Sequence, residues 1–391
     1  MPRFFSLIAA VLAAATLHAQ PFDGVLQSVE THNTTLAALR RAADAEKAAA
    51  RADLTLPDPE VEFGYMWGSP SAIGSRKNFS ARQSFDIATL SGARRRAAAE
   101  AGRLADWQYR MGRMEILQQA YGCCLDVIYY NALLAELTVR SDNARQIAEA
   151  QKRRLDAGDA TQMEYHAARL DLAAVEAETK RCTTERQAAL DALALLNGGE
   201  AVRLDAAEFP AVEVPADFET WYADAEGRHP ALAYARQAVA ASKQQLAVSK
   251  AGRLPEFSLG FDGEYVLGER YQGITLGVSI PLWAGRGKVR QARAEKEAAE
   301  AREHDACAQF YGQMANLFRK QQGLRATADI YTKALASLDD TALLKRSLDA
   351  GQISVVEYLQ AVRLYYDAVQ QRLDALREWH MAYAEMTAVM W

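Results

Sequence analysis

One eleven-residue pattern occurs twice in this chain. It reads Leu-Asp-Ala-Gly-Asp-Ala-Thr-Gln-Met-Glu-Tyr at 155–165 and Leu-Asp-Ala-Gly-Gln-Ile-Ser-Val-Val-Glu-Tyr at 348–358. In each copy a helix is predicted to end just before a glycine, Gly158 or Gly351, because glycine takes the left-handed conformation at a helix end without steric cost. The two glycines are 193 residues apart, about half of the chain. The sequence therefore predicts two copies of one unit, each with a sharp helical hairpin at its tip.

Each hairpin is predicted to continue into a helix with a capping box. Thr161 is followed three residues later by Glu164, and Ser354 is followed in the same way by Glu357. In this motif the hydroxyl accepts a hydrogen bond from the glutamate's backbone amide, and the carboxylate accepts one from the backbone amide of the capping residue. Two unrelated helix turns are the alternative, but they would not be expected to share so many residues at one spacing.

Proline is absent from two very long parts of the chain, 71–209 and 282–391. Both are free to be helical, since proline breaks a helix in its interior. Four predicted helices flank the tips: 93–157 and 161–196 in the first half, and 288–350 and 354–391 in the second. At about 1.5 Å per residue, the two that lead into the tips would each be roughly 95–100 Å long. The halves are joined by residues 197–217, which we interpret as a belt around the helical body.

Alternation of apolar and polar residues follows a Leu-Pro pair in each half, Leu56-Pro57 and Leu254-Pro255. Such alternation is typical of strands with one apolar and one polar face. The four predicted strands lie at about 60–68, 77–86, 256–266 and 272–281. The aromatic positions expected to face lipid are Phe63, Tyr65, Trp67, Phe257, Phe261 and Tyr265. A small half-buried sheet that packs on the helices is the alternative to a sheet in a membrane.

The first 19 residues have the pattern of a secretory signal: Arg3, an apolar run from Phe4 to Leu17, and the small residue Ala19. This run is too short to span a membrane comfortably, and no later stretch is expected to approach the roughly 18 apolar residues of a membrane helix. Two observations favour a sheet in a membrane: the chain has an export signal, and the predicted strands are close to the roughly 9–11 residues of a tilted membrane strand. Lipid admits strands only in closed barrels, and four strands cannot close alone, so this alternative requires oligomerisation.

Signals of other functions are weak. The net charge is −5, so no basic footprint suggests nucleic acid. The six histidines are scattered and the four cysteines lack metal-ligand spacing. No metal site, cofactor or catalytic constellation is therefore predicted, and an enzyme is not expected. Free thiols buried in helices are the favoured state of the cysteines, although the sequence leaves their pairing open.

These elements in this order resemble the TolC-type outer-membrane efflux proteins, the outer channels of tripartite efflux pumps and type I secretion systems. The resemblance covers the mature chain and rests on the duplication, the Leu-Pro pairs, the Ser-Ile-Pro-Leu-Trp-Ala-Gly segment at 279–285, and the two Ala-Gly tips. It implies a mainly α fold with a small membrane β part, duplicated over 20–200 and 201–391. It also implies a homotrimer in the outer membrane, with a twelve-stranded β-barrel and a long helical barrel that crosses the periplasm.

The resemblance further implies partners and site residues. The tips would meet a periplasmic adaptor protein, and an inner-membrane pump, of the RND type, would drive transport. The implied adaptor-docking residues are Leu155, Ala157, Gly158, Thr161, Leu348, Ala350, Gly351 and Ser354. The implied gate residues are Glu164, Glu357, Tyr358 and Gln360.

Glu164 and Glu357 lie one turn inside the tips, where the family carries acidic residues near its constriction. A trimer would bring six such carboxylates together, and like charges held close raise one another's pKa and favour cations. The capping role of the two glutamates is the alternative, and both roles are compatible.

Two positions near the gate depart from the family pattern. Ile353 stands where an arginine often helps to lock the closed tip, and Gln360 stands where an aspartate often lines the narrowest point. The closed state would then depend on packing by Tyr358 and Leu359. The predicted function is the outer-membrane channel of a tripartite efflux pump, a passive exit duct. The alternatives are the outer channel of a type I protein secretion system and a periplasmic helical scaffold protein, and the sequence does not identify the substrate as drug, metal cation or protein.

Overall fold

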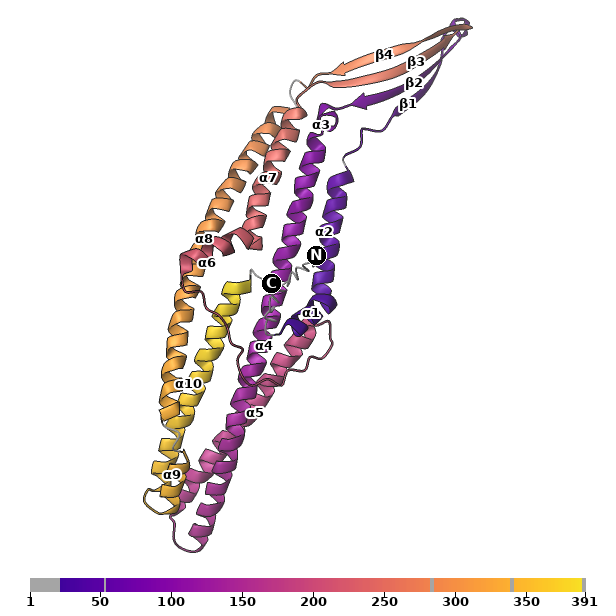
Figure 1. Cartoon of the computed structure of the whole chain (residues 1–391). Coiled ribbons are helices and arrows are strands. Elements are labelled where there is room, and N and C mark those ends of the chain that lie inside the picture. The colour runs from indigo at the N-terminus through magenta and orange to yellow at the C-terminus, as the bar shows by residue number, and fades with distance from the viewer. Residues whose placement is uncertain (1–21, 53, 282–284, 338–340, 389–391) are drawn as a thin grey trace, which may run out of the picture.

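The computed structural model describes residues 22–52, 54–281, 285–337 and 341–388. These residues form an elongated, mainly helical molecule with one four-stranded antiparallel sheet, which confirms the predicted fold class for a single protomer (Figure 1). The sheet projects from one end of the helical body, and the two hairpin tips lie together at the opposite end (Figure 1). The signal segment predicted at 1–19 lies outside the described residues.

The order of elements is repeated in the two halves of the chain. The first half contains α1 (Asp23–His32), α2 (Thr34–Ala52), β1 (Glu60–Trp67), β2 (Ser75–Phe85), α3 (Ile87–Leu90), α4 (Ala93–Asp156) and α5 (Gln162–Leu196). The second half contains α6 (Phe218–Arg228), α7 (Pro230–Ala251), β3 (Glu256–Val266), β4 (Glu269–Ser279), α8 (Gly285–Ser337), α9 (Thr341–Asp349) and α10 (Val355–Thr387). The sequence predicted a single helix over 288–350, where the structure has α8 and α9, and the three residues between them lie outside the described part.

Helix α4 extends through most of the helical body (Figure 1). Its 64 residues correspond to about 96 Å at the usual rise of an α-helix. It contains an 18-residue stretch with a mean hydropathy of 1.2. Among the described helices, α4 is the one that is long and apolar enough to cross a membrane. No such stretch after the signal segment was predicted from the sequence. Core helices pass the same test, and α4 supplies buried residues to three hydrophobic clusters, so we assign it to the helical body.

Two shorter helices meet end to end at mid-height in each half. Asn33 donates from Nδ2 to the backbone oxygen of Leu196 at 2.7 Å, which fastens the start of α2 to the end of α5. In the second half, Met386 near the end of α10 packs in one buried cluster with Leu232 near the start of α7. His229 precedes α7 and caps it by accepting a hydrogen bond from a backbone amide at 3.3 Å.

The linker over 197–217 has no helix or strand and crosses the helical body between α5 and α6 (Figure 1). Asn131 on α4 donates to the backbone oxygens of Leu204 and Ala206, at 3.1 and 2.8 Å. Phe209 packs against two of the buried clusters. These contacts agree with the interpretation of the linker as a belt.

The sheet has the strand order β1-β2-β3-β4, so β1 and β4 form its two edges. Strand β4 begins at Glu269 rather than at about 272, because the turn before it consists of only Leu267 and Gly268. Both turn residues have positive φ, 47° and 95°. Two-residue hairpin turns require such conformations, and glycine favours them whereas leucine does not signal them.

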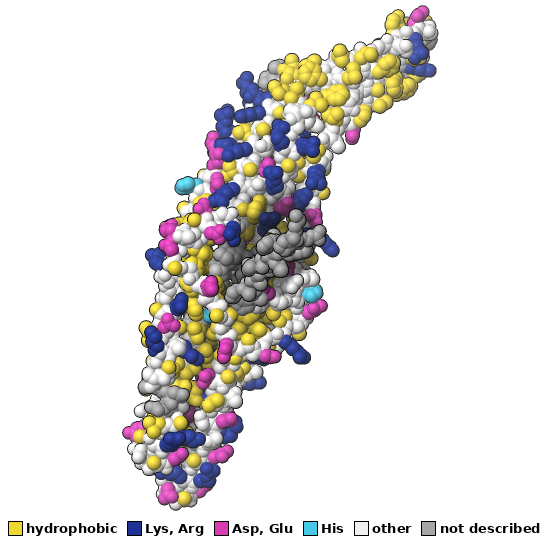
Figure 2. All heavy atoms as spheres, viewed as in Figure 1, with side chains coloured by type: hydrophobic (Ala, Val, Ile, Leu, Met, Phe, Trp, Pro, Cys, Tyr) yellow, Lys and Arg dark blue, Asp and Glu magenta, His cyan; other side chains and the backbone are white. Residues whose placement is uncertain are grey.

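Residues paired across the strands share a face of the sheet. One face is apolar and contains rows such as Val61–Ala81–Phe261–Ile274. The opposite face is polar and contains rows such as Glu62–Ser80–Asp262–Gly273. Figure 2 shows hydrophobic side chains gathered over the sheet, in contrast with the mixed charges on the helical body.

Candidate functional site

The two tips have the same backbone geometry. At the first, the amide of Gly158 donates to Leu155 at 3.0 Å and that of Asp159 donates to Arg154 at 2.8 Å. At the second, the corresponding bonds from Gly351 to Leu348 and from Gln352 to Ser347 are 3.0 and 2.9 Å. The glycines have φ of 82° and 73°, in the left-handed region. These bonds satisfy the last carbonyls of each helix, as the duplicated pattern predicts.

The capping box is complete at the start of both returning helices. A carboxylate oxygen of Glu164 accepts from the amide of Thr161 at 2.7 Å, and the hydroxyl of Thr161 accepts from the amide of Glu164 at 3.2 Å. In the second copy the corresponding distances between Glu357 and Ser354 are 2.8 and 3.2 Å. The backbone hydrogen bond from the capping residue lowers the pKa of each glutamate below its usual value. Within one protomer, capping therefore lowers the pKa of these carboxylates. Repulsion between carboxylates in a trimeric ring would raise it.

The predicted gate residues of α10 do not share one environment. Tyr358 is only 3% exposed and packs with Ile147 of α4 and Ala168 of α5 in the buried cluster between the tips. Its burial raises the pKa of its hydroxyl to about 12. Glu357 and Gln360 are exposed. Tyr358 thus joins the two hairpins within one protomer, and Leu359 packs beside it.

Most of the predicted docking residues are exposed at the end of the molecule. Ala157, Gly158, Thr161, Ala350, Gly351 and Ser354 are exposed, and Leu155 and Leu348 are half-buried. A groove of about 610 Å³ lies between the last turns of α4 and the second tip, and Leu348 and Gly351 contribute to it. Gln151 also lines this groove, is only 3% exposed, and its Oε1 has no hydrogen-bond partner in the described part of the chain. The groove therefore contains a buried acceptor that a partner could satisfy.

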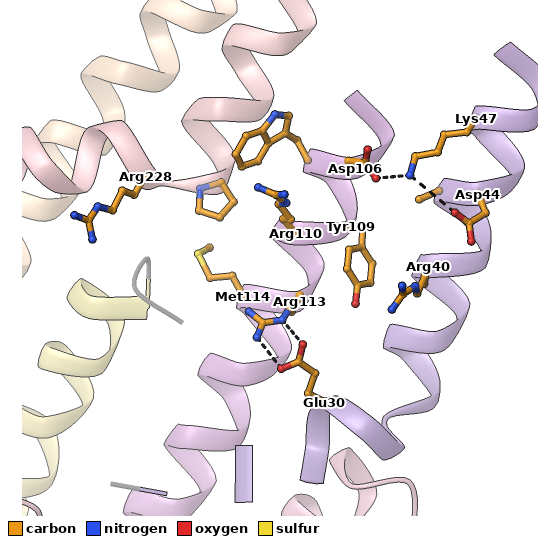
Figure 3. A pocket seen from close by; sticks show the side chains of 13 residues that line it. Glu30, Arg40, Asp44, Lys47, Asp106, Tyr109, Arg110, Arg113, Met114 and Arg228 are labelled. Carbon is orange, nitrogen blue, oxygen red and sulfur yellow. Dashed lines mark hydrogen bonds and ion pairs between the residues drawn. The ribbon is translucent and has the colours of Figure 1, made fainter. Parts of the chain in front are cut away.

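A second hollow, of about 760 Å³, lies near the waist between α2, α4 and the start of α7 (Figure 3). Arg113 donates from Nε and Nη2 to the two carboxylate oxygens of Glu30, at 2.6 and 2.7 Å. These bonds lower the pKa of Glu30. Lys47 pairs with Asp106 across the same hollow. These ion pairs fasten α1 and α2 to α4, so we interpret this hollow as structural.

The aromatic residues expected to face lipid all lie on the apolar face of the sheet and are exposed. Trp67 and Phe63 are 81% and 69% exposed, and the remaining four are between 42% and 51% exposed: Tyr65, Phe257, Phe261 and Tyr265. Such exposure of large apolar side chains marks a surface that another phase or partner covers. Whether that phase is lipid stays a prediction.

The four cysteines are free in the structure; Cys124 and Cys182 are buried, as favoured from the sequence, whereas Cys123 and Cys307 are only half-buried. Burial raises the pKa of Cys124 to about 12 and that of Cys182 to about 11, so neither is a ready nucleophile. Among the described residues no group of His, Cys, Asp and Glu side chains could hold a metal ion. Sequence reasoning missed the Arg113–Glu30 pair and the buried Gln151, because neither has a local sequence signal.

Comparisons with known proteins agree with this geometry. Residues 221–390 match the model of the family described as outer membrane efflux protein. The CmeC outer membrane channel of Campylobacter jejuni has a TM-score of 0.77 and 14% identity, over 94% of this chain and 85% of that one. The outer membrane protein VceC of Vibrio cholerae has a TM-score of 0.75 and 16% identity, over 94% and 95%. The open state of the MtrE outer membrane channel of Neisseria gonorrhoeae has a TM-score of 0.70 and 16% identity, over 94% and 88%.

A comparison with the curated proteins finds no match. At the identities of the solved structures, the likeness shows a shared fold. The family match and the shared fold together confirm the resemblance drawn from the sequence.

Proposed function

We propose that this chain is the outer-membrane channel of a tripartite efflux pump, because residues 221–390 match the model of the outer membrane efflux protein family. It would be a passive exit duct, with substrates delivered by an inner-membrane pump through a periplasmic adaptor. The family consists of outer-membrane efflux proteins, in agreement with the expectation that the chain is not an enzyme.

The observation that carries the proposal is the open, two-faced sheet. Its edge strands β1 and β4 each have one side without a strand partner in the described chain. An open edge leaves unpaired amides, which hydrocarbon does not tolerate. Three copies joined β4 to β1 would close a twelve-stranded barrel, with the apolar face toward lipid and the polar face toward a water-filled lumen.

The opposite end supplies the adaptor-docking part of the proposal. The groove beside the second tip combines the half-buried Leu348, the exposed Gly351 and the unpaired amide oxygen of the buried Gln151. A helical hairpin of an adaptor could cover Leu348 and donate a hydrogen bond to Gln151. No observation favours a type I secretion role over efflux, and the exposed apolar sheet speaks against a periplasmic scaffold, which would need to cover it.

The test is expression of the full chain, with a candidate adaptor and pump, in a bacterium that lacks its own outer efflux channel. We expect the chain to fractionate with the outer membrane, to run as a heat-sensitive trimer and to restore resistance to exported compounds. Cysteines at Val61 and Ile274, on the two edge strands, should give cross-links between chains. A chain that stays monomeric and soluble in the periplasm would overturn the proposal, and export of a protein instead of small compounds would favour type I secretion.

A further inference from the structure

The charged residues on the apolar face of the sheet have one sign and lie at one level. Among the described positions on this face, Lys77 and Arg270 are the charged side chains. The strand register aligns them with two tyrosines in a single row, Tyr65–Lys77–Tyr265–Arg270. This row lies beside the hairpin turns, at the end of the sheet farthest from the helices (Figure 1).

Each cation in the row contacts a tyrosine ring. The Nζ of Lys77 lies 5.8 Å from the ring centroid of Tyr65, and the guanidinium of Arg270 lies 5.3 Å from that of Tyr265. Cation–π contacts at these distances hold the positive groups over the rings but leave their N–H donors free for an acceptor. Neither cation forms an ion pair with a described residue.

The opposite face treats a cation at the same level differently. Arg76, adjacent to Lys77 in sequence, points to the polar face and pairs with Glu264, at 2.6 Å between Nε and Oε1 and 3.0 Å between Nη2 and Oε2. The sheet thus supplies a carboxylate to Arg76 on its polar face and none to the two cations on its apolar face. Both apolar-face cations are therefore available to an anionic group from the surroundings.

The space around the row has room for such a group. A hollow of about 570 Å³ opens beside Lys77 and Tyr265, bounded by the turn at Leu267 and Gly268 and by Gly74 of the other hairpin. A Cβ on Gly74 would meet the Leu267 side chain at 2.5 Å, so the two hairpins pack tightly behind the hollow. The next row toward the helices begins with the aromatic pair Phe63 and Phe79.

We propose that Lys77 and Arg270, with Tyr65 and Tyr265, form a binding site for the phosphate groups of lipids in the outer leaflet. This inference rests on the proposed function, which makes the apolar face lipid-facing. The apolar rows then contact acyl chains, the tyrosines lie at the interface, and the two cations meet the headgroup phosphates above it. In a trimer, Arg270 on edge strand β4 would adjoin Tyr65 on edge strand β1 of the next protomer, so tyrosines and cations would alternate around the barrel.

The lipid below the row can be measured through a Phe63→Trp substitution in a protein that also carries Trp67→Phe, because Phe63 lies one row nearer the helices on the same face and is 69% exposed. The full-length trimer would be reconstituted in phosphatidylcholine vesicles that contain a minor share of brominated phosphatidylglycerol, of brominated phosphatidylcholine, or of lipid A. Bromine quenches tryptophan fluorescence on contact, and a Trp67→Phe protein supplies the background from the other tryptophans. The ratio of quenching by the two brominated lipids gives the preference for anionic lipid, and lipid A serves as an unbrominated competitor.

We expect the trimer to prefer the anionic lipid, lipid A to displace it, and each cation removed to lower the preference about fivefold. Lys77→Gln with Arg270→Gln should therefore abolish the preference, whereas Arg76→Gln, at the same level on the polar face, should keep it. The charge-conserving pair Lys77→Arg with Arg270→Lys should keep it too. Equal quenching of the Phe63→Trp trimer by both lipids, with both cations in place, would overturn the phosphate site alone. If neither lipid quenches the fluorescence that Phe63→Trp adds, the sheet is not in the bilayer and the proposed function itself fails. Competition by inorganic phosphate at equal phosphate concentration would overturn the assignment to lipid.

Discussion

The ring of Phe209 stacks on the imidazole of His380, with centroids 5.0 Å apart and planes 10° apart. Phe209 belongs to the linker between the halves, and His380 lies on α10 and is only 2% exposed. The Nδ1 atom of His380 has no hydrogen-bond partner among the described residues. Burial therefore lowers the pKa of His380 to about 4, which keeps the imidazole neutral under the belt at neutral pH.

The first prediction is that acid loosens this contact. In the unfolded chain the histidine takes up a proton near its ordinary pKa of 6.5, but in the folded chain it does so only near 4. The unfolded state thus binds more protons between these values, and stability falls as pH falls through this window, by up to about 1.4 kcal/mol per pH unit. His380→Phe keeps a ring against Phe209 and removes the titration. Its thermal midpoint in detergent should fall less between pH 7 and 5 than that of the unaltered protein. The exposed His166, changed to Gln, is the control and should leave the pH dependence as it was.

The second prediction concerns backbone conformation at the tips. A Cβ on Gly351 would meet no atom within 4 Å, so only its φ of 73° opposes a side chain there. Gly351→Ala should cost about 1–2 kcal/mol locally, and Gly351→Asn should cost less, since asparagine tolerates this conformation. Hydrogen exchange of the tip amides measures both. Gly323→Ala is the matched control, because Gly323 also has open space but lies inside helix α8, where alanine should stabilise. The bulky Gly351→Trp should abolish export while the trimer stays in the membrane, and normal export by it would show that the tip does not dock a partner.

The third prediction tests the two faces of the sheet. Phe261 lies in the row of the apolar face that also contains Ala81, and it should contact hydrocarbon. Phe261→Arg should cost roughly 2–4 kcal/mol if the row lies near the bilayer midplane, and Phe63→Arg should add to the loss. Ser80→Arg places the same charge on the polar face, one residue from Ala81. Assembly into heat-sensitive trimers is the measurement. We expect the apolar-face pair to lose assembly and the polar-face control to keep it, so equal behaviour of the two would contradict the assignment of faces.

The features that could be predicted from the sequence are those with local causes. The helix ends at Gly158 and Gly351 follow from backbone sterics, and the capping boxes follow from side chains three residues apart. The apolar and polar faces of the strands follow from the alternation of apolar and polar residues in the sequence. Successive side chains of a strand point to opposite faces, so all the apolar residues of a strand lie on the same face. The turn at Leu267 escaped the sequence prediction, since leucine rarely has positive φ.

The features that could not be predicted arise from contacts between distant segments. Tyr358 is buried because the two hairpins pack against each other there, and no local signal shows this contact; its expected role at the gate stays a prediction. Arg113 and Glu30 are 83 residues apart, and nothing in either segment indicates the other. The row of Lys77 and Arg270 needed the register of three strand pairs before its single sign was visible.

The last prediction concerns the charge of Glu164 and Glu357. Glutamine is also a capping-box residue at this position, so Glu→Gln removes the charge and keeps much of the cap. If six carboxylates form a ring at the tips of a trimer, the double substitution should reduce cation selectivity and weaken block by divalent cations in planar bilayers, most strongly at low salt. Arg154, near the first tip, donates a hydrogen bond from Nη2 to the backbone oxygen of Asp159 at 3.1 Å. Arg154→Gln removes a positive charge there and should therefore increase cation selectivity. An unaltered reversal potential in double-variant channels that still open would leave capping as the only role of the glutamates.

The pH at which cation selectivity is lost then shows whether capping or mutual repulsion has the larger effect on the pKa of these carboxylates. Capping alone lowers the pKa of both below 4.5, so selectivity and the cap's stabilisation should persist down to that pH and disappear as pH falls through the lowered value. Repulsion within a ring acts in the other direction and would move the loss above 4.5, since protonation relieves it. Selectivity measured across this range in the unaltered channel, with the double Gln variant as the pH-independent reference, decides which of the two effects is larger. A loss well above 4.5 would support a tight ring, and a loss well below it would mean that the six groups stay far enough apart for capping to dominate.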